Sequence, residues 1–349
     1  MSQTYRVGII GCGGMSKNHA KAYTENPRTT LVAAMDINKD SAAKLSQDFS
    51  IPAVYTDYNE LLEKEDLDIV SIVTWQGVRA EITIAAAEAG VKGILGEKPM
   101  ASCLGEADDM IETCEKHGAK LVIGHQGRFS PKSVEIRRLI RDGAIGQPTL
   151  LHGRSKPNAG LLNIGTHVID GWRYQLSDPE TLWVIGQISR TTDKWERRTL
   201  CEDLCMGLIC FEGGARGIYE SDLPEPAISG TVIYGTAGQI RNDADGRLVI
   251  QTDENKGWTE IQAAPEESNQ FQELIDWIEE KIDDHRSSGR QARYTMEIMM
   301  AIYESLRIKN VVNMPLETKE SPLELMVQDG TLPVLTEGRY DIRRAFPEQ

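Results

Sequence analysis

The stretch Arg6–His19, RVGIIGCGGMSKNH, decides the fold of the first part of the chain. It opens with a short β-branched run, which is typical of a buried parallel strand, and continues with the composition of a helix. Between them, Gly11 is placed to make a tight turn and Gly13 to let the backbone approach a pyrophosphate at the helix N-terminus. We therefore expect a dinucleotide-binding loop that includes Gly14 and Met15.

The loop alone is weak evidence, because Ser16 is larger than the glycine or alanine usual at the third position of G-x-G-x-x-G. Asp36 strengthens it. This residue ends the next apolar run, Leu31 to Met35, about twenty residues past the loop, where a carboxylate accepts from the ribose 2′-OH of NAD. NADP is disfavoured by that carboxylate, although Lys39 lies nearby. The alternative is an ordinary turn in which glycines only reverse the chain.

Length and composition limit the class of protein. A chain of 349 residues is long enough for two domains, and we expect a dinucleotide-binding domain over 1–123 and a second domain over 124–349. The formal charge of −15 argues against nucleic acid or an anionic membrane as a partner. The first strand follows Met1 too closely for a signal peptide, so we expect a cytoplasmic protein. Six scattered cysteines without C-x-x-C spacing predict reduced thiols and no metal site.

Between residues 30 and 122 strand-like and helix-like runs alternate, which predicts an α/β fold with a parallel, doubly wound sheet. Ligands of such sheets bind beyond the carboxyl ends of the strands. The segments to inspect are therefore those that directly follow the apolar runs: Gly11 to Ser16, Asp36, Thr74 to Gln76, Glu97 to Pro99 and His125 to Arg128.

Lys98 is the most chemically suggestive of these residues. An acid precedes it and a proline follows it, so its ammonium is held at the expected crevice. The alternative is a common Glu-Lys pair on the protein surface.

A polar stripe marks the second half of the chain. Pro131 to Asp142 reads as a helix, Thr149 to Arg154 as a strand and Leu161 to Leu176 as a mainly apolar helix. Four polar residues of that last helix share one face: Asn163, His167, Asp170 and Tyr174. A lone buried histidine is more often structural, but the companion residues favour a chemical role along a cleft.

The remaining segments predict a second sheet and a tail. Close-set apolar runs between Trp183 and Val249, separated by turn signals, predict a mostly antiparallel sheet. Helices are expected over Glu267 to His285 and Thr295 to Lys309, and an extended arm from Met314 to Gln349.

Several motifs together resemble the Gfo/Idh/MocA family of nicotinamide-dependent oxidoreductases. The loop GCGGMSKNH is similar to its G-x-G-x-x-G-x-x-H, GEKPMA to its E-K-P signature and GHQGRFSP to its N-x-R-F-x-P stretch. NIGTHVID resembles its D-I-G-x-H-x-x-D, and YGTAGQI, AIYESLR and VVNMPL resemble its C-terminal landmarks.

The resemblance implies a Rossmann domain followed by an α/β domain whose large open sheet often forms the interface of a homodimer or homotetramer. It also implies that Lys98 and His167 meet over the nicotinamide of NAD, where Lys98 stabilises the alkoxide and neutral His167 takes the hydroxyl proton. The expected cofactor-binding residues are Gly11, Gly13, Gly14, Met15, Asp36, Thr74, Trp75, Gln76, Glu97, Lys98 and Gln126. The expected substrate-binding residues are Lys98, Arg128, Asn163, His167 and Tyr174.

Three departures from the family pattern affect these roles. Asn163 stands where the family frequently has aspartate, so the base must be His167, because an amide cannot serve as one. The run from Thr74 to Arg79 replaces the family's T-P-x-x-x-H, and the indole of Trp75 within it suits the apolar face of a sugar. The asparagine usual before R-F is missing, and Gln126 is the expected substitute.

Three functions are compatible with this sequence. The leading hypothesis is an NAD-dependent dehydrogenase that oxidises a secondary hydroxyl of a sugar, glycoside or cyclic polyol. The second is redox-neutral glycoside cleavage, in which retained NAD oxidises a sugar carbon transiently and elimination follows. The third is a non-catalytic sensor that binds a dinucleotide, since a fold does not fix a function.

Overall fold

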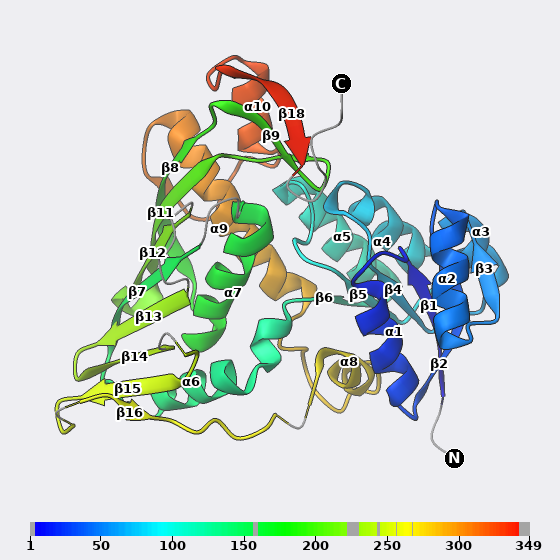
Figure 1. Cartoon of the computed structure of the whole chain (residues 1–349), viewed down its shortest axis with the longest axis horizontal. Helices are drawn as coiled ribbons and strands as arrows, with labels where there is room; N and C mark the ends of the chain where they lie inside the picture. Colours follow the sequence, from blue (N-terminus) through cyan, green and yellow to red (C-terminus); the bar gives the residue numbers. More distant parts are fainter. Residues whose placement is uncertain are drawn as a thin grey trace. The chain divides into compact units, whose positions relative to one another are not determined.

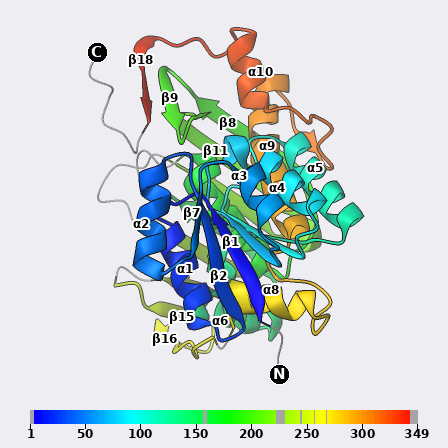
Figure 2. The same cartoon turned by 90° about the vertical axis from the view of Figure 1, so that its right-hand side faces the viewer.

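The computed structural model describes residues 4–155, 160–221, 230–242, 245–255, 257–266 and 268–341. The chain divides into two compact units, whose elements are labelled in Figures 1 and 2. Unit 1 comprises Met1–Gly124 and Ser268–Ala292, and unit 2 comprises His125–Glu267 and Arg293–Gln349. No helix within the described ranges has both the length and the apolar content needed to cross a membrane.

Unit 1 is built on a six-stranded parallel sheet with the spatial order β3-β2-β1-β4-β5-β6. The order reverses between β1 and β4, which is the switch point of a doubly wound Rossmann fold. The predicted fold class is thus confirmed. The strands are β1 (Tyr5–Ile10), β2 (Thr29–Met35), β3 (Ala53–Tyr55), β4 (Ile69–Ile72), β5 (Gly93–Gly96) and β6 (Lys120–Ile123).

Helices cover both faces of this sheet, because successive side chains of a buried strand point to opposite sides. Val7 and Ile9 of β1 pack in one core with residues of α1 and α8, while Ile10 packs in the other with residues of α4 and α5. The helices of unit 1 are α1 (Ser16–Glu25), α2 (Lys39–Phe49), α3 (Tyr58–Lys64), α4 (Arg79–Glu88), α5 (Leu104–His117) and α8 (Gln270–Ile278).

Helix α8 reaches unit 1 from far along the chain. It packs where β5 has no side chain, since a Cβ at Gly93 would lie 2.7 Å from Cδ1 of Ile278. The predicted helix from Glu267 to His285 is therefore too long: Glu267 lies outside the described residues, and the helix ends at Ile278. Glu280 follows with a φ of 55°, which no α-helix accommodates.

Unit 2 contains a nine-stranded sheet with the order β16-β15-β14-β13-β7-β12-β11-β8-β17. Only the β12–β7 pair is parallel, so the prediction of a mostly antiparallel sheet is confirmed. The strands are β7 (Pro148–Arg154), β8 (Thr181–Ser189), β11 (Leu204–Phe211), β12 (Arg216–Glu220), β13 (Gly230–Gly235), β14 (Gly238–Asn242), β15 (Leu248–Thr252), β16 (Thr259–Glu260) and β17 (Val312–Asn313).

Two helices pack on one face of this sheet, each against glycines of the strands. Trp172 of α7 (Thr166–Gln175) lies against β7 and β12, where a Cβ at Gly153 or Gly217 would come within 2.6 Å of its ring. Gly186 and Gly207 make the same room for Ile302 of α9 (Gly289–Ile308). The boundary between the two units falls within α9. Helix α6 (Pro131–Arg141) completes the larger helices of unit 2.

The C-terminal segment is more ordered than the expected extended arm. Ser321 caps α10 (Pro322–Gln328), with Pro322 at the first helical position. A small sheet has the order β10-β9-β18 and contains β9 (Thr192–Glu196), β10 (Thr199–Leu200) and β18 (Thr336–Asp341). Residues 342–349 of the expected arm lie outside the described residues.

Candidate active site

The glycine loop between β1 and α1 has distinct requirements at each position. Gly11 has a φ of 93°, and a Cβ there would lie 2.8 Å from the carbonyl carbon of Val73, so only glycine fits. A Cβ at Gly13 or Gly14 would instead meet nothing within 4 Å. Within the described residues, the N–H groups of Gly13, Gly14 and Met15 donate no hydrogen bond. Open space beside unused donors at a helix N-terminus fits a dinucleotide pyrophosphate.

Asp36 lies directly beside this loop, as predicted from its place after β2. One carboxylate oxygen accepts from the Cys12 N–H at 2.7 Å, and the other accepts from the Asn38 N–H at 2.8 Å. Burial, with the Asp36 charge, raises the pKa of the Cys12 thiol to about 12, so the thiol stays neutral. The carboxylate is therefore held in a fixed orientation at the strand end where ribose binds in Rossmann folds.

Glu97 and Lys98 follow β5 and are each 8% exposed. His19 of α1 bridges Glu97 and β4: its Nε2 lies 3.0 Å from Glu97 Oε1, and its Nδ1 lies 2.7 Å from Ser71 Oγ. Burial opposes ionisation of Glu97, but His19 and the nearby cations Arg79 and Lys98 hold the pKa of its carboxyl below the ordinary value. An ionised Glu97 thus anchors the segment that carries Lys98.

Arg79 is a site residue to which the sequence analysis assigned no role. Its buried guanidinium donates to the carbonyl of Thr74 after β4 and to the carbonyl of Pro99 after Lys98. It therefore ties together two segments that were both predicted to hold the cofactor, and Trp75 and the buried Gln76 lie in the first of them. The available signal was its position, where the resembled family carries histidine.

In unit 2, His167 lies in the first turn of α7 and is partly exposed. The ring of the buried His125 lies next to it, with the two ring centroids 6.4 Å apart. Nε2 of His125 lies 2.9 Å from the Thr166 hydroxyl, and its Nδ1 lies 3.6 Å from an Asp170 oxygen. Gln126, the expected substitute for asparagine, is exposed.

Arg128 does not present its guanidinium for a substrate contact. The side chain has no exposed surface, and two of its nitrogens bond Asp170 at 2.8 Å each while a third bonds Asp178 at 2.9 Å. Burial opposes ionisation of Asp170, but Arg128, His125 and Arg173 lower the pKa of its carboxyl to about 2.

Tyr174 belongs to the same cluster and is 5% exposed. The guanidinium carbons of Arg128 and Arg137 lie 5.4 and 4.5 Å from the centroid of its ring. The helical spacing correctly placed Asp170 and Tyr174 beside one another, but it did not reveal the arginine clamp. Arg128 and Tyr174 are thus both buried and in contact with each other, an arrangement that favours a structural role over a substrate contact.

Asn163, the first member of the predicted stripe, lies in a π-helical turn, η3 (Leu161–Gly165), that leads into α7. Its side-chain amide donates to Glu196 of β9, and both residues are buried. Glu196 is a second residue that sequence reasoning missed, since nothing in its surroundings along the chain points to Asn163.

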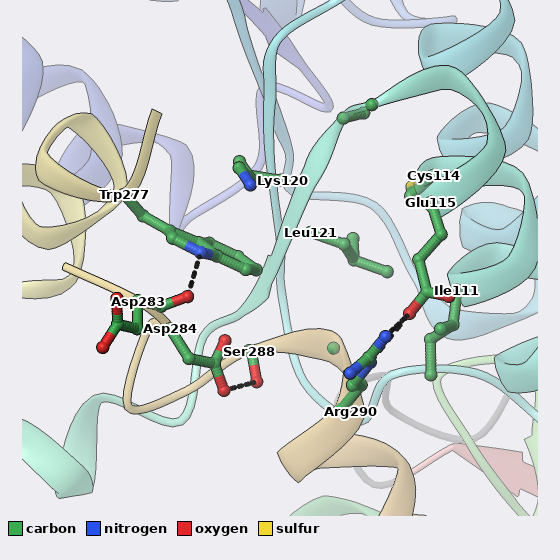
Figure 3. A pocket seen from close by; sticks show the side chains of 13 residues that line it. Ile111, Cys114, Glu115, Lys120, Leu121, Trp277, Asp283, Asp284, Ser288 and Arg290 are labelled. Atoms are coloured by element: carbon green, nitrogen blue, oxygen red, sulfur yellow. Dashed lines mark hydrogen bonds and ion pairs between the residues drawn. The ribbon is translucent and has the colours of Figure 1, made fainter. Parts of the chain in front are cut away.

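Figure 3 shows a pocket of about 460 Å³ in unit 1 that contains none of the predicted site residues. It lies at the amino end of β6, whereas the glycine loop and Lys98 follow the carboxyl ends of strands. Its polar side chains bond one another: Arg290 pairs with Glu115, and Ser288 donates to Asp284. This pairing is that of a structural cleft, and we assign it no ligand.

Comparisons with known proteins agree with this architecture. A family model described as an oxidoreductase family with an NAD-binding Rossmann fold matches residues 5–125. The uncharacterized oxidoreductase YrbE of Bacillus subtilis is 32% identical over 260 residues, covering 70% of this chain and 75% of YrbE.

Two curated relatives act on carbohydrates or polyols by name. D-apiose dehydrogenase of Paraburkholderia graminis is 24% identical over 94% of both chains. Myo-inositol 2-dehydrogenase of Thermotoga maritima is 26% identical, covering 71% of this chain and 78% of the relative. The WlbA dehydrogenase of Bordetella pertussis, solved with NADH and UDP-GlcNAcA, shares the fold with a TM-score of 0.76 and 20% identity over 90% of this chain and all of that one.

Proposed function

The chain belongs to the Gfo/Idh/MocA family of oxidoreductases with an NAD-binding Rossmann fold, and from this premise we propose that it oxidises a secondary hydroxyl of a sugar, glycoside or cyclic polyol. Relatives named for D-apiose and myo-inositol support this substrate class. The observation that carries the proposal is the position of Lys98 at the carboxyl end of β5 in unit 1, where His19 holds the preceding Glu97 and Arg79 holds the following Pro99.

Two side chains divide the chemistry of the hydroxyl. Oxidation of a carbinol removes a proton from oxygen and a hydride from carbon, and bound NAD accepts the hydride. His167 takes the proton as a neutral imidazole, because its ordinary pKa lies near neutrality. Lys98 stabilises the developing alkoxide with its ammonium. Asn163 binds a second hydroxyl of the substrate. Arg128 and Tyr174 hold α7 in place within unit 2.

The cofactor preference follows from Asp36. Its fixed carboxylate accepts from the ribose 2′-OH of NAD and repels the 2′-phosphate of NADP. The unused N–H groups of the glycine loop support the pyrophosphate in either case.

The test is a panel of sugars, glycosides and cyclic polyols with added NAD, followed through the near-ultraviolet absorbance of reduced nicotinamide. Steady NADH formation with one substrate, abolished by His167→Ala, is the expected result. Release of an aglycone without net NADH, from protein that copurifies with NAD, would instead establish redox-neutral glycoside cleavage. A panel without either response, with biological activity retained by Lys98→Ala and His167→Ala, would establish the sensor.

The open face of the nine-stranded sheet supports a homodimer or homotetramer. A row of side chains crosses the sheet by register, one from each of five neighbouring strands: Ile185, Leu208, Ile218, His152 and Val232. It faces away from α7 and α9, which contact the glycines one residue along β7, β8, β11 and β12. Ile185 is 41% exposed. Light scattering should therefore give a mass of two or four chains, and a monomer would overturn this assignment.

A further inference from the structure

Asn163 and Glu196 form a buried pair that the sequence did not predict. The side-chain amide of Asn163, which is 7% exposed, donates from Nδ2 to Oε1 of Glu196, which is 4% exposed. An ionised carboxylate only accepts hydrogen bonds, so it determines that the NH₂ end of the amide faces β9. The opposite end of the amide therefore points away from Glu196.

The start of η3 is shaped to receive this carboxylate. A Cβ at Gly160 would overlap Oε2 of Glu196 and Sγ of Cys201, so any other residue there would displace the carboxylate. A second buried acid, Glu202, lies close by, and the Cys201 thiol contacts both carboxylates. Glu202 accepts from the Leu161 N–H and the Tyr303 hydroxyl, each at 2.6 Å. Glu202 therefore holds the backbone of η3, whereas Glu196 holds the side chain of Asn163.

Keeping a carboxylate at position 196 carries an energetic penalty. Burial raises the pKa of the Glu196 carboxyl above its ordinary value, and the Asn163 amide partly offsets that effect. Replacing a buried charged group with a well-packed apolar residue is often neutral or stabilising, so stability alone does not account for a carboxylate here.

We propose that Glu196 is a positioning residue for substrate binding, which fixes the Asn163 amide so that one defined end of it meets a substrate hydroxyl. The pair then replaces the aspartate that the family frequently has at position 163. Its carboxylate belongs to Glu196 of β9, which accepts a hydrogen bond from the Asn163 amide. This inference rests on the proposed function, because it assigns Asn163 to the substrate of that reaction.

The experiment compares wild-type protein with four variants: Glu196→Gln, Asn163→Asp, the double variant N163D/E196Q and the control double variant N163D/E202Q. For each we would measure kcat and KM for the oxidised substrate, the NAD Kd by fluorescence titration, and the melting temperature. The control removes the other buried carboxylate near η3, which accepts from the Leu161 N–H, whereas Glu196 accepts from the Asn163 amide.

Glu196→Gln is expected to raise the substrate KM by about 10-fold or more with the NAD Kd unchanged, because an amide partner no longer determines which end of Asn163 faces it. Asn163→Asp buries two carboxylates together and should lower both kcat/KM and the melting temperature. N163D/E196Q should recover most of both, since donor and acceptor are simply exchanged between the two positions. N163D/E202Q should recover less of either quantity, because Glu202 repels Glu196 but bonds the backbone of η3.

Two results would overturn the proposal: an unchanged KM in Glu196→Gln, or a double variant N163D/E196Q no better than Asn163→Asp. Failure of the proposed function looks different. A silent substrate panel removes the dehydrogenase assignment, while the melting temperatures still test the pairing. A larger recovery in N163D/E196Q than in N163D/E202Q supports the pairing, and equal melting temperatures of the two double variants contradict it.

Discussion

The glycine loop of unit 1 and the η3–α7 segment of unit 2 both begin a helix, but they treat their polar groups in opposite ways. Three N–H groups of the loop make no hydrogen bond within the described residues, beside open space. At η3, in contrast, carboxylates of the same unit receive the Leu161 N–H and the Asn163 amide. The loop is therefore a surface that a ligand completes, whereas the polar groups around α7 largely complete one another.

The largest expected effect comes from removing the charge of Arg128 from its buried cluster with Asp170 and Asp178. Arg128→Met leaves Asp170 and Asp178 without their main buried partner, so we expect a loss of about 3–5 kcal/mol in the free energy of unfolding. Urea denaturation measures it. The control is Arg137→Met, whose partly exposed guanidinium also bonds Asp178 and should cost no more than about 1 kcal/mol. Equal stability of Arg128→Met and wild type would show that the clamp is dispensable.

Lys98→Met tests unit 1, where a bound ligand is expected to complete the site. Removing the charge that stabilises the alkoxide should lower kcat by about 10²–10³-fold while the melting temperature changes little. Lys92→Met is a matched control, because that lysine pairs with Asp68 on the surface of the same unit. A Lys98→Met enzyme with normal kcat would remove Lys98 from the reaction.

Acid titration tests the same buried cluster through the protonation of Asp170. Its pKa falls from an ordinary 3.8 to about 2 on folding, so its contribution is present above the unfolded pKa and is lost as pH falls through the folded one. The shift is worth about 2 kcal/mol. The stability difference between wild type and Asp170→Asn should therefore shrink by that amount between about pH 5 and pH 2. A pH-independent difference would contradict the assigned pairing.

The smallest expected effect concerns cofactor choice. Asp36→Asn removes the charge that repels a 2′-phosphate but keeps an acceptor near the Cys12 N–H. The ratio of NADP Kd to NAD Kd should fall by about 10-fold, which corresponds to 1.4 kcal/mol. Titration of both nucleotides measures the ratio, and an unchanged ratio would place the discrimination elsewhere.

Most of the fold of unit 1 could be predicted from short stretches of sequence. The strand, loop, helix and acid from Arg6 to Asp36 follow one another along the chain, and the alternating runs between residues 30 and 122 predicted the parallel sheet that the structure has. Hydrophobic periodicity and helix-capping residues suffice there, because each element packs against the element that is next to it along the chain. The same kind of signal was present but missed at Ser321, where S-P-L-E is a capping pattern.

Unit 2 was less predictable, because its important contacts join residues far apart in the chain. Helical spacing placed Asp170 on the His167 face, but Arg128 comes from the segment after β6 and Glu196 from β9. Only the arrangement of strands brings these groups together. The sequence therefore predicted which residues carry chemistry, while the structure shows which of them already bond other side chains of the same unit.

The most direct test of the central claim is the rate of hydride transfer in a single turnover by His167→Ala, measured together with its NAD Kd. We predict a rate lowered by about 10²–10⁴-fold, as for loss of a general base, with the NAD Kd unchanged because unit 1 alone supplies the glycine loop and Asp36. A normal rate of hydride transfer would contradict it and would end the assignment of His167 as the base.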